Sequence, residues 1–264
     1  MSIENCWGDK EQYDYPALVA ELNSLLKFQA IITGMKRYAT VEEMESIPKI
    51  RRPNPAEKLN TDQIVGQSRW LGYTIGVTVE NLMGSQCSAV VGLSPRDEEF
   101  LSGNAFNGMW YGSLEDSAEH QRQMSCASYG NYTSLAVSPI VSGRLGNPDI
   151  CLIYATPGQM ILFINGLQWS GYKKLSFTCV GESACADSWG NALKTGEPSL
   201  SIPCYAERKF GGVQDNEMLM ALPPSFLPIA VNGLKALAKN GMRYPIPNHG
   251  IDVSPMTTFM KIYG

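Results

Sequence analysis

The C-terminal half of the chain alternates apolar runs with segments of helical pattern. Short continuous apolar runs are typical of strands that are buried on both faces, and Gly, Pro and Thr separate these runs from the helical segments. Two successive strand–helix–strand units favour right-handed connections in a largely parallel sheet. We therefore expect strands at 149–155, 174–180 and 198–206, with helices at 157–170 and 184–195.

The N-terminal half is less regular. Leucines at helical spacing predict a helix over residues 15–28, and a strand over 29–39 should follow it. Thr61 is the expected N-cap of a helix over 62–71, which Gly72 should end.

Two further stretches complete the expected organisation. Residues 94–132 have little periodicity and many Gly, Ser, Asn and aromatic side chains, which is typical of a lid or a binding loop. After the Gly pair at 211 and 212, residues 217–223 should form a strand antiparallel to its neighbour, followed by a last helix from Ser225.

These patterns predict an α/β or α+β fold whose C-terminal half is a mixed, partly parallel sheet flanked by helices. The chain has 264 residues, of which 44% are hydrophobic, and this is enough for one large core. We expect a single compact domain over 1–264, with 1–132 and 133–264 as an alternative division into two packed lobes. Because the apolar helices outnumber one visible core, we also expect a homo-oligomer.

Charge and hydropathy narrow the classes of partner. The formal net charge is -4 and the isoelectric point is near 5.3, so no nucleic-acid-binding face is expected. The chain contains neither a signal-peptide pattern nor an apolar run of about eighteen residues. Seven cysteines without a framework spacing are typical of reduced thiols. We expect a cytoplasmic protein that binds a small-molecule substrate and no membrane.

Residues 178–191 (TCVGESACADSWGN) combine thiols with carboxylates. Within this stretch, residues 180–183 lie where an expected strand ends and an expected helix begins, which is the edge where open α/β sheets bind ligands. Cys185 lies in the first helical turn, where backbone amides and the helix dipole lower the pKa of a thiol. Glu182 and Asp187 could complement the same dipole or exchange protons.

One candidate chemistry is acid/base catalysis without a cofactor. In such a site carboxylates transfer protons, and a Lys or Arg side chain holds the developing anion. The candidates for proton transfer are Glu80, Glu182, Asp187 and Glu207, and those for the anion are Lys36, Arg144 and Arg208.

Two other chemistries compete for the cysteines. Cys185 could be a nucleophile, and the only histidines available as its base are His120 and His249. Alternatively, a thiolate metal site or iron–sulfur cluster could use Cys87, Cys185 and Cys204, although the chain has no short paired spacing such as C-x2-C.

Nucleotide and zinc-hydrolase motifs are missing from the sequence. No dinucleotide fingerprint, P-loop, H-E-x-x-H or EF-hand pattern occurs. Our leading hypothesis is therefore a cofactor-independent enzyme of lyase, hydratase or isomerase type that acts on a small organic acid or aromatic compound. The alternatives are the thiolate metal protein and a non-catalytic small-ligand-binding module. The residues expected to carry the catalysis are Lys36, Glu80, Asp187, Arg208 and Cys185.

Residues 68–93, 138–169 and 185–227 resemble the family called domain of unknown function 169. The most specific matches are the Cys-Ala-Asp that opens a helix, the Thr-Gly-Glu-Pro-Ser turn, and a cysteine followed by a basic residue. The resemblance implies a cytoplasmic bacterial or archaeal protein without a settled activity. The family pattern falls on Lys36, Glu80, Cys87, Cys185, Asp187, Cys204 and Arg208.

Two places depart from the family pattern. Relatives often carry a cysteine where Asp62 and Gln63 stand here, and often Gly-Cys-Arg-Gly where this chain has PCYAER around Cys204. On the sequence alone, these departures favour a small-molecule enzyme over a thiolate cluster.

Overall fold

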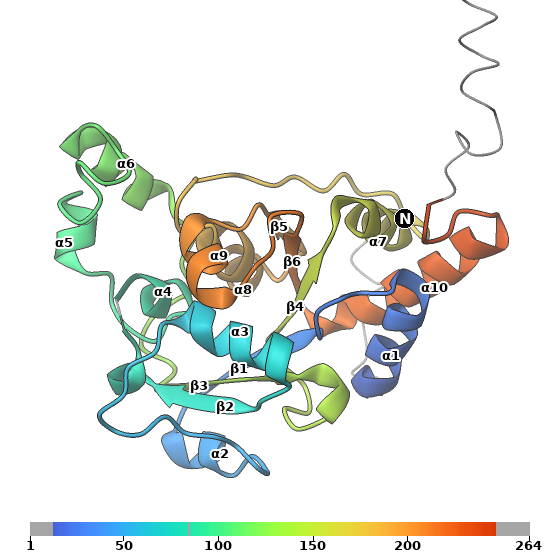
Figure 1. The fold of residues 1–264 in the computed structure, drawn as a ribbon, viewed down its shortest axis with the longest axis horizontal. Coiled ribbons are helices and arrows are strands. Elements are labelled where there is room, and N and C mark those ends of the chain that lie inside the picture. Colours follow the sequence, from blue (N-terminus) through green and yellow to red (C-terminus); the bar gives the residue numbers. More distant parts are fainter. Residues whose placement is uncertain (1–12, 84, 247–264) are drawn as a thin grey trace, which may run out of the picture.

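The computed structural model describes residues 13–83 and 85–246, which contain one six-stranded sheet (Figure 1). The strands lie in the order β2-β3-β1-β4-β6-β5, and each neighbouring pair is antiparallel. β1 comes from the N-terminal half of the chain and lies between β3 and β4 of the C-terminal half, so both halves contribute to the same sheet. The strands are β1 (Thr33–Tyr38), β2 (Ile75–Thr78), β3 (Ser134–Pro139), β4 (Ile150–Ala155), β5 (Ser199–Ser201) and β6 (Met218–Leu222).

The prediction of a partly parallel sheet is wrong. β4 is hydrogen-bonded to β1 on one side and to β6 on the other, and both neighbours run antiparallel to it. β5 runs in the same direction as β4, but β6 lies between them and pairs with both. Neither expected strand–helix–strand unit therefore brings two parallel strands together. The α/β class itself holds, and β6 is antiparallel to its neighbours as expected.

Residues 174–180 form no strand, although their apolar run predicted one. Both edges of β4 are already occupied, so this segment runs outside the sheet and exposes Phe177 and Cys179. A short apolar run does not by itself decide whether a segment joins a sheet. We call residues 171–182 the strap; in Figure 1 it is the long tan connection that crosses the top of the view.

Alternate side chains along β4 divide the core into two layers, one on each face of the sheet. Cys151 and Ile153 point to one face, which we call the α7 face. There they pack with α1 (Tyr15–Leu26), α7 (Pro157–Gln168) and α10 (Leu227–Lys239).

The opposite face carries Leu152 and Tyr154, and we call it the α3 face. Here the sheet packs against α3 (Thr61–Leu71) and against η4 (Ala186–Gly190), a π-helical turn that continues into α8 (Asn191–Thr195). The remaining elements are α2 (Val41–Glu45), η2 (Val79–Asn81), α4 (Ser85–Val90), α5 (Glu98–Leu101), α6 (Leu114–Gln123), η3 (Ile140–Ser142), α9 (Tyr205–Gly211) and η5 (Pro224–Phe226).

The predicted end of α3 is confirmed, but its predicted N-cap is wrong. Asn60, rather than the expected Thr61, caps α3: its side chain accepts a hydrogen bond from the Gln63 backbone, and the Gln63 side chain accepts one from the Asn60 backbone. Gly72 ends α3 in the left-handed conformation, as expected. The reciprocal Asn60–Gln63 pair is a capping box, which satisfies two backbone amides at the helix start.

Residues 94–132 are not an open lid. They contain α5 and α6, and the Phe106 ring between these helices lies 5.6 Å from the ring of Phe100 and 5.5 Å from that of His120. The Ser117 hydroxyl also donates a 2.6 Å hydrogen bond to the Gly103 carbonyl. This part of the chain is thus folded, and ring contacts and a hydrogen bond hold its helices together.

None of the helices within residues 13–83 and 85–246 is long and apolar enough to cross a bilayer.

Candidate functional site

Three thiols gather on the α3 face of the sheet. Cys87 on α4 and Cys185 at the start of η4 place their sulfur atoms 3.8 Å apart. Cys204 immediately precedes α9 and is also buried. Cys185 has only 1% of its surface exposed.

Two carboxyl groups lie in the same region. Asp62 on α3 is 4% exposed, and its Oδ1 has no hydrogen-bond partner among the described residues. Glu207 on α9 is 1% exposed; its Oε2 accepts a hydrogen bond from the Cys204 backbone at 3.1 Å, whereas Oε1 has no partner among the described residues. Leaving a buried polar atom unpaired costs free energy.

The close approach of α3 and α9 brings these carboxyl groups together. A side chain at Gly66 would place its Cβ 2.7 Å from the Gly211 carbonyl oxygen, so only glycine fits at this helix contact. Gly211 in turn faces Asp62, whose backbone oxygen would be 3.2 Å from a Cβ added at Gly211. The helix contact therefore fixes the position of Asp62 beside α9.

We call Asp62, Cys87, Cys185, Cys204 and Glu207 the thiol–carboxyl cluster. Burial raises the pKa of Asp62 well above its usual value, and the charges of Glu207 and Glu182 raise it further. Burial likewise raises the pKa of Glu207 to about 7, against hydrogen bonds from Cys204 that lower it. Both carboxyl groups thus favour their protonated, neutral forms more than an exposed carboxyl group does.

The pKa values of the three thiols are raised as well. The contact with Cys87, followed by burial, raises the pKa of Cys185 well above its usual value. The contact with Cys185 lowers the pKa of Cys87, but burial and the charge of Asp62 outweigh it, so the pKa is raised. Burial and the charge of Glu207 raise the pKa of Cys204. The expectation that the helix start lowers the pKa of Cys185 is therefore not met, because the contact with Cys87 and burial both raise it.

A buried ion pair borders the cluster. The Arg69 guanidinium donates to Glu217 at 2.6 Å and lies 3.9 Å from the centre of the Tyr154 ring. Both charges are almost fully buried, and they neutralise each other. The pairing leaves Asp62 and Glu207 without this arginine as their own ion-pair partner.

Asp187 lies near the cluster, but its carboxylate is engaged elsewhere. It accepts a 2.7 Å hydrogen bond from the Thr178 hydroxyl and a 2.8 Å hydrogen bond from the Val180 backbone. Both donors belong to the strap. Asp187 therefore fastens the strap to η4, and this structural role accounts for both of its oxygens.

Glu182 and His120 tie the strap to two further elements. The Glu182 carboxylate accepts hydrogen bonds of 3.2 Å from the backbone of Tyr205 and of Ala206, at the start of α9. The Glu182 carbonyl contacts Nε2 of the largely buried His120 at 2.7 Å. Burial lowers the pKa of His120. His249 lies outside the described residues.

The remaining sequence-predicted residues lie apart from the cluster or are held by other contacts. Lys36 follows Met35 on β1, so its side chain points to the face opposite the thiols, where its ammonium donates to the Leu145 carbonyl at 3.2 Å. Glu80 is exposed in η2. Arg208 donates to the Gln214 carbonyl at 2.6 Å. The structure does not join Lys36 to Asp187 or Cys185 in one site.

Arg144 also has a structural contact, because it donates a 2.9 Å hydrogen bond to the Thr74 hydroxyl.

Sequence reasoning missed Asp62 and Arg69 as site residues. Asp62 was interpreted only as the first residue of the expected helix and as a departure from the family pattern, and Arg69 was assigned no role. Their spacing was the available signal, because residues seven apart lie on one face of a helix, here the face that also buries Val65. Charged residues on an apolar helix face are candidates for a buried polar site.

As its side chains are placed, the described part of the chain contains no group of three or more His, Cys, Asp or Glu residues that could hold a metal ion.

Comparison with known proteins gives one match. The model of the DUF169 family, described as uncharacterised ArCR, matches residues 21–233, which confirms the resemblance drawn from the sequence. No curated protein and no solved structure matches the chain.

Proposed function

This chain belongs to the DUF169 family of uncharacterised proteins, and we propose that its thiol–carboxyl cluster binds a thiophilic metal centre, either a metal ion or an iron–sulfur cluster. Cys87 and Cys185 supply the first two ligands, and Cys204 and Asp62 complete the set.

The observation that carries the proposal is the separation of the first two thiols. Two thiolates bound to one tetrahedral metal ion, each about 2.3 Å from it, lie about 3.8 Å from each other. The sulfur atoms of Cys87 and Cys185 are 3.8 Å apart. The separation of this pair therefore matches that of two thiolate ligands on one metal atom. Since no complete ligand set is formed as the side chains stand, Cys204 and Asp62 must rotate toward that atom.

The charge balance of the cluster supports the same proposal. Metal ligands bind in their deprotonated forms, and the cation replaces the protons. The unpartnered oxygen of Asp62 has no compensating contact among the described residues, and a bound cation would supply one. The family resemblance drawn from the sequence implies that relatives often carry a cysteine at the place of Asp62. Because carboxylate oxygens are also metal ligands, this departure retains an anionic ligand rather than losing one.

A second candidate is acid/base catalysis at the same cluster. Its support is the pKa of Glu207, raised to about 7, since a proton-transfer group works best when its pKa is near the working pH. Here Glu207 moves the proton, and the Asp62 carboxyl group beside it is the acidic partner. A lyase, hydratase or isomerase acting on a small organic acid or aromatic compound remains the corresponding proposal.

Metal and acid-labile sulfide content per chain, measured after purification without oxygen, tests the first candidate. We expect near-stoichiometric metal in the unmodified protein and in Cys179→Ser, a matched control whose thiol is exposed on the strap. Cys87→Ser and Cys185→Ser should lose the metal. A folded, metal-free protein that binds neither zinc nor iron on reconstitution would exclude the metal centre and leave the acid/base candidate.

A further inference from the structure

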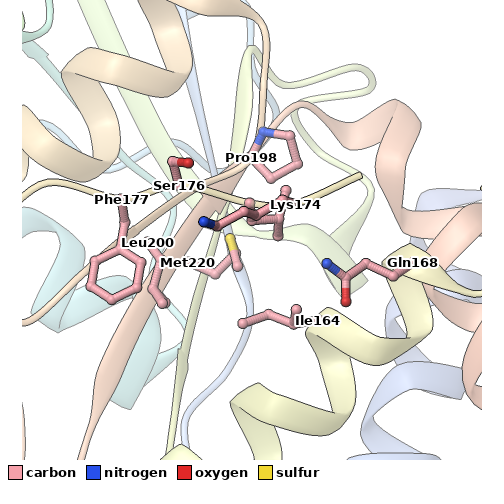
Figure 2. A pocket seen from close by; sticks show the side chains of 9 residues that line it. Ile164, Gln168, Lys174, Ser176, Phe177, Pro198, Leu200 and Met220 are labelled. Atoms are coloured by element: carbon pink, nitrogen blue, oxygen red, sulfur yellow. The ribbon is translucent and has the colours of Figure 1, made fainter. Parts of the chain in front are cut away.

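A second feature, separate from the thiol–carboxyl cluster, is a small cavity beneath the strap (Figure 2). It lies at the β5 edge of the sheet, on the α7 face. Its volume is about 110 Å³. The lining residues are Ile164, Gln168, Lys174, Leu175, Ser176, Phe177, Pro198, Leu200 and Met220.

The wall of the cavity is mainly apolar. Leu200 and Met220 come from the two outermost strands on this side, Ile164 from α7, and Leu175 and Phe177 from the strap. Apolar cavities stay dry and take apolar groups of matching size. The cavity therefore suits a hydrocarbon group.

One charge stands at this apolar wall. Lys174 extends from the strap over the cavity, between Gln168 and Phe177 in Figure 2. No ion pair involves Lys174 within residues 13–83 and 85–246, whereas the adjacent Lys173 pairs with Glu197 at 2.8 Å. The lining contains no Asp or Glu. The positive charge of Lys174 is therefore complementary to a single anionic group on a ligand.

The volume of the cavity limits the size of the hydrocarbon group that can bind. A cavity of about 150 Å³ is known to hold benzene, and this one is smaller, at about 110 Å³. A short branched aliphatic chain fits such a space better than an aromatic ring that also carries a carboxylate.

The roof of the cavity can move without opening the sheet. The strap forms no strand, and contacts at Lys173 and at residues 178–182, on either side of the roof residues 174–177, hold it. The Gln168 side chain donates to the Lys173 carbonyl at 2.8 Å, and the Tyr111 hydroxyl donates to the Val180 carbonyl at 3.3 Å. Segments with few backbone hydrogen bonds open at low free-energy cost. A ligand therefore has a route into the cavity.

From these observations we propose that the cavity binds a short branched aliphatic carboxylate. The hydrocarbon chain fills the space between Leu200, Met220 and Ile164, and the Lys174 ammonium pairs with the carboxylate. The proposal does not depend on a metal centre, because the cavity and the thiols lie on opposite faces of the sheet.

The test is an NMR titration of the full chain with 3-methylbutanoate, since this method detects the weak binding expected of so small a ligand. We expect saturable shifts at the lining residues. The neutral isostere 3-methylbutan-1-ol and the larger benzoate should each bind more weakly. Absence of saturable shifts with 3-methylbutanoate, or equal binding of the alcohol and the acid, would overturn the proposal.

Variants locate the binding. Lys174→Met should weaken carboxylate binding by about fivefold, the upper range for an ion pair near the surface, and leave binding of the alcohol unchanged. Ser176→Trp, on the exposed strap, should fill the cavity and abolish both. Lys173→Met is the matched control and should bind as the unmodified protein does. Unchanged binding in Ser176→Trp would place the ligand elsewhere and refute the site.

Discussion

The sulfur atoms of Cys87 and Cys185 lie 3.8 Å apart, although 98 positions separate the two residues in the sequence. The contact joins α4 to the π-helical turn η4. π-Helical turns are rare and occur frequently at functional sites. This one begins directly after Cys185, which is its N-cap, and includes Asp187, the residue that fastens the strap.

Thiol reactivity should follow burial. Among the thiols of residues 13–83 and 85–246, we expect iodoacetamide to modify the exposed Cys179 first in the native protein, and Cys151 and Cys185 last, because burial removes access and raises the pKa of both buried thiols. Mass spectrometry of timed digests measures the order. If Cys185 were alkylated as fast as Cys179, it would be an activated nucleophile instead, and the raised pKa would be refuted.

Stability of the metal-free protein should depend on the protonation of Glu207. Its pKa rises from 4.5 in an unperturbed chain to about 7 in the folded protein, so the folded state holds this proton more tightly than the unfolded state does. Stability should therefore fall as pH rises from about 4.5 to about 7, by roughly 3 kcal/mol from this group. Urea unfolding across this range measures the effect.

The Glu207→Gln variant isolates this contribution. It should show a flatter dependence of unfolding free energy on pH, because the amide does not titrate. Glu80→Gln changes an exposed glutamate and is the control that should behave as the unmodified protein. A profile of Glu207→Gln that matches the unmodified protein would show that Glu207 titrates normally.

Asp187→Asn should loosen the strap. The substitution replaces one of the two carboxylate oxygens with an NH2 group, which cannot accept a hydrogen bond. One of the two strap donors, the Thr178 hydroxyl or the Val180 backbone, therefore loses its acceptor. We expect a loss of about 1 to 2 kcal/mol and faster hydrogen exchange at Val180. Asp215→Asn, at an exposed carboxylate, is the control. Unchanged exchange at Val180 would contradict the fastening role.

Gly66→Ala should separate α3 from α9. The added methyl group would lie 2.7 Å from the Gly211 carbonyl oxygen, so the backbone must shift. We expect a loss of about 1 to 3 kcal/mol of stability and weaker metal binding, since Asp62 moves with α3. Gly158→Ala in α7 is the matched control, because its nearest neighbour is a side-chain carbon 3.8 Å away. Equal stability of the two variants would show that the helix contact is not tight.

Sequence patterns correctly predicted those helices and strands that depend on residues close together in the chain. The leucine spacing over residues 15–28 predicted α1, the apolar run at 149–155 predicted β4, and Gly72 ended α3 as expected. Each signal acts within a few residues, through hydrophobic periodicity or a left-handed glycine. Even so, the choice between Asn60 and Thr61 as the cap was wrong, because both residue types favour that position.

Only the tertiary structure decided which strands pair and which polar groups meet. β6 lies between β4 and β5, and an apolar run cannot show which strand will be its neighbour. Cys87, Cys185 and Cys204 were grouped from the sequence only as an alternative metal site, and Asp62 comes from a fourth separate segment, so no spacing placed it with them. Burial raises the pKa of Asp62, and the contact with Cys87 followed by burial, rather than the local helix start, sets the direction of the pKa shift of Cys185. Local propensity is a short-range property, whereas strand pairing and burial depend on the whole chain.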